Sequence, residues 1–272
     1  MNQEEKEDSI RRPAASGTFY PNDKKKLENL LQAFLEGQKK EGIAGLISPH
    51  AGYAYSGRIA GKAYSLLRGT QKRTVVIIGP NHTGLGAPVS VYPGGFWETP
   101  LGKVKVDEEK AREIGNEFWL EKEAHELEHS IEVQIPFMQY TLKDFKIVPV
   151  CMMDQSMETA KELGKILSKA LDSEKDLVIA STDFSHYVPE EIAEEYDKKA
   201  IRSITNLDQE GLYSLVFSGF SMCGYGPVCA LIEYTKQNNG RIHEVEYGTS
   251  GETTGDTSQV VGYASLYSEV KK

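Results

Sequence analysis

Two histidines follow two apolar runs of the chain in the same way. The run at residues 43–47 ends in a turn that carries His50, and the run at residues 75–78 ends in a turn that carries His82. Each turn contains a proline, which donates no backbone hydrogen bond, and a glycine, which accepts turn conformations. Neutral imidazole is a common ligand of transition metals. Two imidazoles presented at two strand ends therefore predict one shared metal site.

Two later turns carry side chains of related chemistry. The apolar run at residues 177–180 leads into a segment with Asp183 and His186, and Cys223 lies in a turn rich in glycine. Thiolate binds metals as imidazole does, although a free cysteine can also be a small buried apolar residue. Structural zinc sites tend to use closely spaced cysteine pairs, which this sequence lacks. Ligands spread over separate loops favour an open catalytic site.

The remaining candidates support more than one interpretation. His186 and its neighbour Asp183 are the candidate catalytic residues, with His186 as general acid or base. Asp183 could instead bind the metal or hydrogen-bond a ligand histidine. His129 is equally compatible with capping or outer hydrogen bonding and with direct contact to the ion. Asn81, His129 and Tyr53 are expected behind the ligands or at the pocket, with a buried, hydrogen-bonded hydroxyl as the alternative for Tyr53.

The intervening sequence predicts the elements that must hold these turns in place. Strands are expected at residues 43–48, 74–78, 88–92, 146–152, 177–180, 241–249 and 260–267. Helical patterns separate most of them, including one from Asp23 to about Gln38 and one from Asp107 to about Trp119. This alternation predicts an α/β fold of three layers, α/β/α, around a largely parallel to mixed sheet. Such sheets bind ligands beyond the carboxyl ends of their strands.

Composition narrows the functional classes. The 272 residues are 39% apolar and 26% charged, and the formal net charge of −9 argues against nucleic-acid binding. The charged N-terminus has no apolar signal core, and no apolar run approaches the roughly 20 residues of a membrane span. Three cysteines favour a reducing cytoplasm over a disulfide framework. We expect a flexible segment at residues 1–12 and a single domain at residues 13–272.

Five ordered blocks of this sequence resemble the signature of a known family, the Memo family. They are Pro49-His50-Ala51-Gly52-Tyr53, Gly79-Pro80-Asn81-His82, Glu128-His129-Ser130-Ile131-Glu132, Ser181-Thr182-Asp183-Phe184-Ser185-His186 and Cys223-Gly224. Its members include the animal mediator of ErbB2-driven cell motility and the microbial AmmeMemoRadiSam system protein B. The resemblance extends from about residue 13 to residue 267. It implies a fold shared distantly with the class III extradiol dioxygenases, which are non-heme iron enzymes.

The resemblance also implies a ligand set. The family's metal ligands fall on His50, His82 and Cys223, and His186 matches the acid–base histidine of the dioxygenases, with Asp183 beside it in the motif. The dioxygenases use two histidines and a carboxylate, which suits Fe(II). A cysteine in place of the carboxylate shifts the preference toward softer metals. One metal ion is therefore expected, iron(II) or copper first and zinc as the alternative, and no nucleotide cofactor is expected.

Three functions follow from the resemblance. The first is a metal-dependent oxidoreductase, related to the dioxygenases, that acts on a small molecule. The second is a non-catalytic protein that binds a peptide or another ligand, as an adaptor does; animal relatives are associated with the binding of phosphotyrosine peptides. The third, which the microbial family name implies, is an accessory to a radical S-adenosylmethionine protein partner. This chain lacks a Cys-x-x-x-Cys-x-x-Cys motif of its own, so the radical chemistry would belong to the partner.

Overall fold

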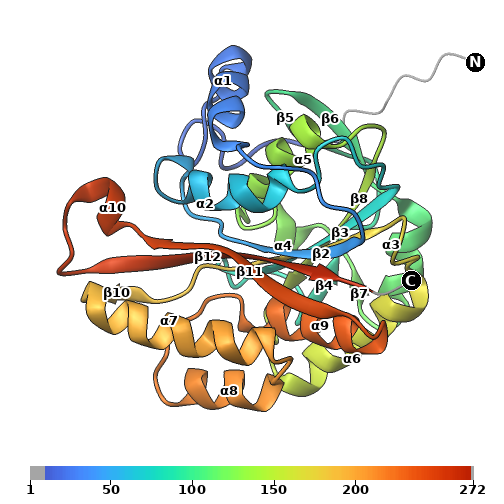
Figure 1. Cartoon of the computed structure of the whole chain (residues 1–272). Coiled ribbons are helices and arrows are strands. Elements are labelled where there is room, and N and C mark those ends of the chain that lie inside the picture. Colours follow the sequence, from blue (N-terminus) through green and yellow to red (C-terminus); the bar gives the residue numbers. More distant parts are fainter. Residues whose placement is uncertain (1–9, 271–272) are drawn as a thin grey trace, which may run out of the picture.

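A computed structural model of the chain describes residues 10–270 (Figure 1). Residues 1–9 of the expected flexible segment lie outside this range. The end of that segment, at residue 12, was placed too late, because Ile10–Arg11 form strand β1 and Arg11 is buried. The Arg11 guanidinium pairs with the Glu132 carboxylate and lies 4.1 Å from the centroid of the Trp97 ring. These contacts hold the start of the described chain on the domain.

A nine-stranded sheet forms the centre of the fold. Its strands follow the order β10-β12-β2-β9-β3-β8-β4-β7, and β11 also pairs with β12. Their bounds are β2 (Ile43–Ser48), β3 (Thr74–Pro80), β4 (Val89–Val91), β7 (Trp119–Leu120), β8 (Lys146–Met152), β9 (Leu177–Ser181), β10 (His186–Val188), β11 (Arg241–Thr249) and β12 (Val260–Glu269). The strands β2, β9, β3 and β8 are parallel, whereas β12 is antiparallel to β2. The predicted mixed sheet is confirmed.

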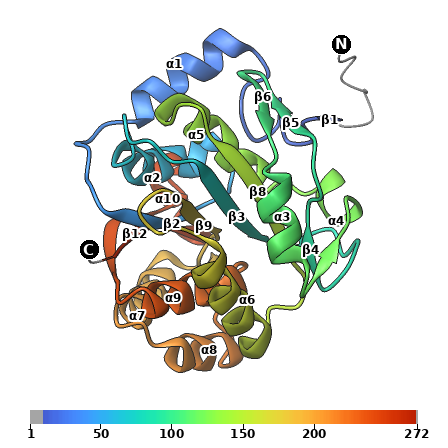
Figure 2. The ribbon, with the colours of Figure 1, turned by 90° about the vertical axis from the view of Figure 1, so that its right-hand side faces the viewer.

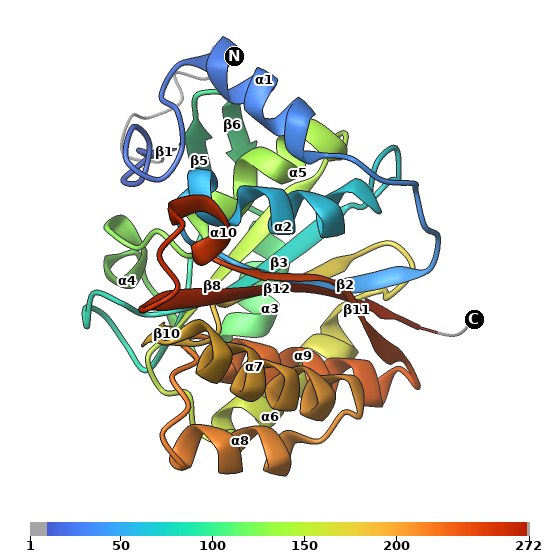
Figure 3. The same ribbon diagram turned by 60° about the vertical axis from the view of Figure 1, so that its left-hand side comes forward.

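Helices cover both faces of this sheet. They are α1 (Lys24–Phe34), α2 (Tyr53–Ser65), α3 (Glu108–Gly115), α4 (Glu123–Glu126), the 3-10 helix η2 (Glu132–Gln134), α5 (Ile135–Thr141), α6 (Met157–Ala170), α7 (Glu190–Thr205), α8 (Gln209–Phe217), α9 (Tyr225–Gln237) and α10 (Gly251–Thr254). Figure 3 shows α1, α2 and α5 on one face and α6, α7, α8 and α9 on the other. The three-layer α/β/α prediction is confirmed. Among residues 10–270, no helix is long and apolar enough to cross a bilayer.

The central parallel strands are apolar because both of their faces are covered. In β3, the four residues 75–78 are completely buried, as are most residues of β9. A second, three-stranded sheet of β1, β5 (Phe96–Thr99) and β6 (Gly102–Lys105) lies beside the main sheet (Figure 2). These layers make a rigid base for the turns at the carboxyl ends of β2, β9 and β3.

The predicted helix from Asp107 to Trp119 is too long. Helix α3 ends at Gly115, where an added Cβ would meet the Leu120 side chain at 2.6 Å. The chain turns back there, and Trp119–Leu120 form the edge strand β7 instead. A helical pattern in sequence could not show this reversal, because the contact that requires glycine comes from residues outside the helix.

Candidate metal centre

The turns after β2 and β3 bring His50 and His82 together. The two strands are not neighbours, since β9 lies between them, yet the centroids of the two rings are 5.1 Å apart. Both strands run in the same direction, so their carboxyl ends open on the same side of the sheet. The predicted meeting of the two imidazoles is therefore present in the fold.

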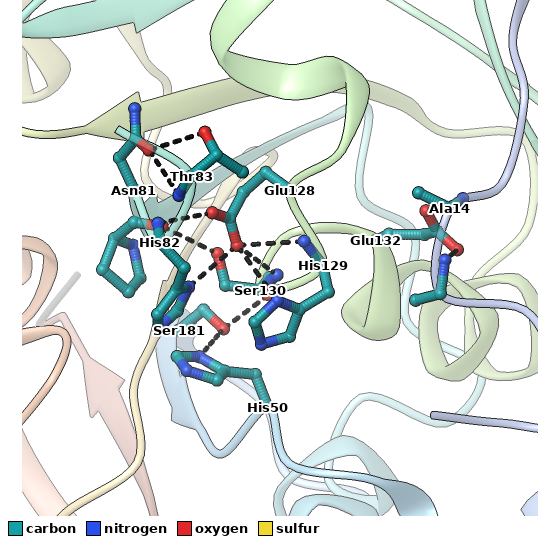
Figure 4. Close-up of polar contacts among 12 residues, drawn as sticks. Ala14, His50, Asn81, His82, Thr83, Glu128, His129, Ser130, Glu132 and Ser181 are labelled. Atoms are coloured by element: carbon teal, nitrogen blue, oxygen red, sulfur yellow. Dashed lines mark hydrogen bonds and ion pairs between the residues drawn. The ribbon is translucent and has the colours of Figure 1, made fainter. Parts of the chain in front are cut away.

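His129 is the third member of this cluster. It lies between α4 and η2, and its ring centroid is 4.6 Å from that of His82 and 5.5 Å from that of His50. Each of the three histidines offers one ring nitrogen, and these atoms all lie within 4.8 Å of one another. Figure 4 shows the three rings converging from separate segments. Among the described residues, this is the group of side chains that could hold a metal ion.

The carboxylate of Glu128 orients two of the three histidines. Glu128 is completely buried. Its oxygens accept hydrogen bonds from the His82 backbone N–H at 2.7 Å, and from the backbone N–H groups of His129 and Ser130 at 2.9 Å each. Its Oε1 also lies 3.0 Å from His82 Nδ1 and 3.5 Å from His129 Nδ1 (Figure 4). Because the carboxylate engages Nδ1 of His82, Nε2 is the nitrogen left for a metal.

These contacts set the charge of the cluster. Burial raises the pKa of Glu128, but hydrogen bonds from His82 and Ser130 outweigh it and lower that pKa to about 2. Burial lowers the pKa of His129 to about 4 and holds the pKa of His50 well below its ordinary value. Glu128 is therefore ionised at neutral pH, while His50 and His129 are neutral. Neutral imidazole is the form that binds a metal.

Cys223 lies beside this cluster and is not part of the three-nitrogen group. Its Sγ is 3.2 Å from His50 Nε2 and accepts the backbone N–H of Asp183 at 3.2 Å. Burial raises the pKa of the Cys223 thiol, and all three cysteines of the chain are free. The sequence ranked Cys223 ahead of His129 as a ligand. In the structure, His129 belongs to the compact group and Cys223 contacts one of its members.

Asp183 and His186 face the same cavity as the histidines. Asp183 Oδ1 accepts the His50 backbone N–H at 2.8 Å, and its Oδ2 is 4.0 Å from His50 Nε2. Burial raises the pKa of Asp183 to about 6. His186 Nδ1 lies 2.9 Å from the Ser221 carbonyl oxygen, so Nδ1 carries the proton of the neutral ring and Nε2 is free to accept one. This arrangement suits proton transfer beside a metal.

The cavity has a volume of about 540 Å³, which suits a small molecule. Aromatic side chains form much of its wall, and the loop that carries α10 contributes hydroxyl groups. The lining residues are Phe19, His50, Ala51, Gly52, Tyr55, His82, His129, Asp183, His186, Tyr187, Ser250, Thr254, Val261 and Tyr263.

Asn81 and Tyr53 support the site without lining the cavity. The Asn81 side-chain oxygen accepts the backbone N–H of Thr83 (Figure 4) and that of Gly84, at 2.9 Å each, which fixes the turn that carries His82. Tyr53 is buried, and its hydroxyl donates to the Val133 carbonyl at 2.7 Å. The structure therefore shows the buried, hydrogen-bonded hydroxyl that was the alternative for Tyr53.

Asp197, a buried carboxylate on α7, holds the segment from Asp183 to His186 in place through hydrogen bonds to Ser185. Asp197 Oδ1 accepts the backbone N–H and the hydroxyl of Ser185 at 3.0 and 2.7 Å, and Oδ2 accepts the Tyr247 hydroxyl at 2.9 Å. Gly262 of β12 pairs with the same segment, because its N–H donates to the Ser185 carbonyl. A Cβ added to Gly262 would lie 1.8 Å from Asp197 Oδ2.

This contact predicts that Gly262→Ala destabilises the domain by about 2–3 kcal/mol, as overpacking of a filled interior does. Urea unfolding measures the loss. The control is Gly52→Ala, whose added Cβ would meet no atom closer than 3.7 Å, with an expected change within about 1 kcal/mol. Equal losses in the two variants would contradict the role given to the Gly262–Asp197 contact.

Comparisons with known proteins match nearly the whole chain to a single family. A family model described as Memo-like protein matches residues 11–267. A MEMO1 family protein of Methanosarcina mazei is 42% identical over 268 residues, covering 96% of this chain and 99% of the relative. One from Methanothermobacter thermautotrophicus is 44% identical over 275 residues, covering 94% and 99%. One from Archaeoglobus fulgidus is 42% identical over 261 residues, covering 94% and 98%.

Proposed function

This chain belongs to the Memo-like family, and we propose that it binds one metal ion through His50, His82 and His129, with the Cys223 thiol beside them as an additional donor for soft metals. The observation that carries the proposal is the approach of three imidazole nitrogens within 4.8 Å of one another. Two features support it. The Nδ1 atoms of His50 and His82 are engaged by Ser181 and Glu128, and burial keeps His50 and His129 neutral.

The donor set indicates the class of metal. Imidazole suits zinc, copper and iron, and a nearby thiolate adds preference for copper(I) and zinc. We propose iron(II) or copper as the resident metal and zinc as the alternative that the same donors accept. A reducing cytoplasm would keep Cys223 available as a free thiol.

The cavity beside the ligands suggests a reaction on a small molecule. We propose a metal-dependent oxidoreductase on a scaffold like that of the extradiol dioxygenases, in which the bound metal supplies the redox chemistry. His186 is the proposed acid–base residue, because its free Nε2 and the carboxyl group of Asp183 belong to the same cavity as the histidines.

The charge of the cavity favours a small-molecule substrate over a phosphorylated peptide. No lysine or arginine is among the described residues that line it, whereas recognition of phosphate usually uses arginine. The roles as an adaptor or as an accessory to a radical S-adenosylmethionine protein have no comparable support from the described residues.

Anaerobic reconstitution followed by elemental analysis tests the proposal. The metal-free protein is incubated with iron(II), copper(I) or zinc, and unbound metal is then removed. One ion per chain is the expected result. Uptake below about one tenth of an equivalent for all three metals would contradict a metal site of any kind, because a preformed cluster of this type should hold its ion through desalting.

Metal binding should also stabilise the fold. A ligand present at 100 times its dissociation constant adds about 2.7 kcal/mol to the free energy of unfolding. For a domain of this size, that corresponds to a rise in Tm of roughly 5–10 °C. Scanning calorimetry of the metal-free protein with and without zinc measures it. His82→Ala is the control and should show no rise, whereas an equal rise in that variant would place the bound zinc elsewhere.

A further inference from the structure

Behind His50, a buried hydroxyl takes part in a closed set of hydrogen bonds. Ser181 ends strand β9 and is completely buried. Its Oγ lies 2.7 Å from the Ser130 carbonyl oxygen, 2.8 Å from Gln134 Nε2 and 3.0 Å from His50 Nδ1. Figure 4 shows Ser181 between His50 and the loop that carries Ser130.

The orientation of the Gln134 amide is fixed by its other partners. Nε2 lies 3.0 Å from the Pro49 carbonyl oxygen, which can only accept a hydrogen bond. The amide nitrogen must therefore face Pro49, and the same NH₂ group donates its second hydrogen to Ser181 Oγ. The opposite end of the amide, Oε1, accepts the Tyr64 hydroxyl at 2.8 Å. Gln134 is thus fully used and is a donor toward Ser181.

The partners of the Ser181 hydroxyl also determine which of them its hydrogen points to. A hydroxyl has one hydrogen and two lone pairs. The hydrogen goes to the Ser130 carbonyl oxygen, which cannot donate, and one lone pair accepts from Gln134. A lone pair is all that remains for His50, so Nδ1 of His50 must be the donor. A neutral imidazole carries one proton, which leaves Nε2 with its lone pair exposed.

We propose that Ser181 is a positioning residue that fixes His50 in the tautomer with the proton on Nδ1. The benefit for metal binding rests on the proposed function, because Nε2 is then the bare nitrogen, on the side of the ring where Cys223 and Asp183 lie. The contact with Cys223 is consistent with this tautomer: the bare Nε2 accepts from the thiol, 3.2 Å away. The opposite tautomer would leave Ser181 Oγ and His50 Nδ1 facing each other with two lone pairs.

Nitrogen NMR of the metal-free protein tests the tautomer directly. The chain has six histidines, which are labelled with ¹⁵N, and His50→Gln identifies the His50 signals by their loss. The expected result at neutral pH is a proton bonded to Nδ1 of His50 and a pyridine-like shift for Nε2. A proton on Nε2 in the wild-type protein would overturn the proposal. This measurement needs no metal, so it stands even if metal binding itself fails.

Two serine variants separate positioning from simple packing. In Ser181→Ala, His50 Nδ1 loses its acceptor, and the proton should move to Nε2, where Cys223 and Asp183 lie. Zinc affinity should fall about 10–100-fold, as it does when an outer partner of a ligand histidine is lost. The control is Ser48→Ala, which removes an equally buried hydroxyl from the paired position of β2 that has no bond to a histidine ring.

The results for Ser181→Ala and its control Ser48→Ala can either support the proposal or overturn it. Ser48→Ala should keep the wild-type tautomer and an affinity within about twofold of wild type. Ser181→Ala that retains the proton on Nδ1 would overturn the proposal. If Ser181→Ala does not fold, the wild-type spectrum decides alone. If wild-type protein shows the expected tautomer and takes up no zinc, the proposed function fails and the positioning of His50 by Ser181 stands.

Discussion

Replacing His50, His82 or His129 by alanine should abolish stoichiometric metal uptake while the fold survives. Each substitution removes one of the three nitrogens that lie within 4.8 Å of one another. Loss of an outer partner already costs 10–100-fold in affinity, so loss of a ligand should cost more than about 100-fold. The core is formed by the apolar strands and helices, so we expect each substitution to cost about 1–3 kcal/mol of stability. Elemental analysis and circular dichroism measure the two effects.

The same experiment with Cys223→Ser distinguishes the two ligand sets. Cys223 contacts His50 but lies outside the compact group, so Cys223→Ser should retain zinc and weaken copper(I), the metal that prefers thiolate. The control is His243→Ala, because His243 pairs with Glu269 on the β11–β12 hairpin and takes no part in the cavity. Loss of zinc in Cys223→Ser, together with retention in His129→Ala, would contradict the three-histidine centre and favour the set His50, His82 and Cys223.

Glu128→Gln should weaken metal binding about 10–100-fold, although residue 128 touches no metal. A carboxylate accepts hydrogen bonds at both oxygens, and in Glu128 these come from four N–H groups of His82, His129 and Ser130. Glutamine would place an NH₂ group against one of these donors and would turn a ring away from the cluster. The buried donor left without a partner should also cost about 1–3 kcal/mol of stability. Zinc titration and urea unfolding measure the two losses.

A matched substitution removes a carboxylate that has no role in the cluster. Glu121 is also held by backbone N–H groups, of Ala87 and Ala124, but it contacts none of the three histidines. Glu121→Gln should therefore leave zinc affinity within about twofold of wild type. A Glu128→Gln protein with unchanged zinc affinity would show that this carboxylate does not orient the ligands.

The depressed pKa of Glu128 predicts how the variant responds to acid. The carboxyl group titrates near 4.5 when unfolded and at about 2 in the fold, so the folded state favours the ionised form. This stabilisation is present above about pH 4.5 and is lost as the pH falls toward 2, in all about 3 kcal/mol. The difference in unfolding free energy between wild type and Glu128→Gln should therefore shrink over that range. A constant difference would mean that the carboxylate is not held in its ionised form.

The sequence predicted those parts of the structure that a local pattern of apolar residues determines. Buried parallel strands are apolar on both faces, so the strands before His50 and His82 could be located, and the turns that follow them had to lie at the same edge of the sheet. The three-layer fold follows from the same alternation of strands and helices.

The place of His129 could not be derived in this way. It follows no strand, and its position depends on contacts with residues far away in the chain. Glu132 nearby accepts the backbone N–H of Ala14 (Figure 4) and that of Ala15, and Arg11 pairs with the same carboxylate. A loop held by such long-range contacts has no periodic signal. The signal that could have raised its rank was the run Glu128-His129-Ser130, which places a carboxylate and a histidine side by side.

An anomalous difference map from crystals of the zinc-reconstituted protein would show whether the three histidines hold one metal ion. We expect one strong peak bounded by the ring nitrogens of His50, His82 and His129, with zinc–nitrogen distances of about 2.0–2.1 Å. A crystal that holds zinc elsewhere, or that holds none among these three rings, would contradict it.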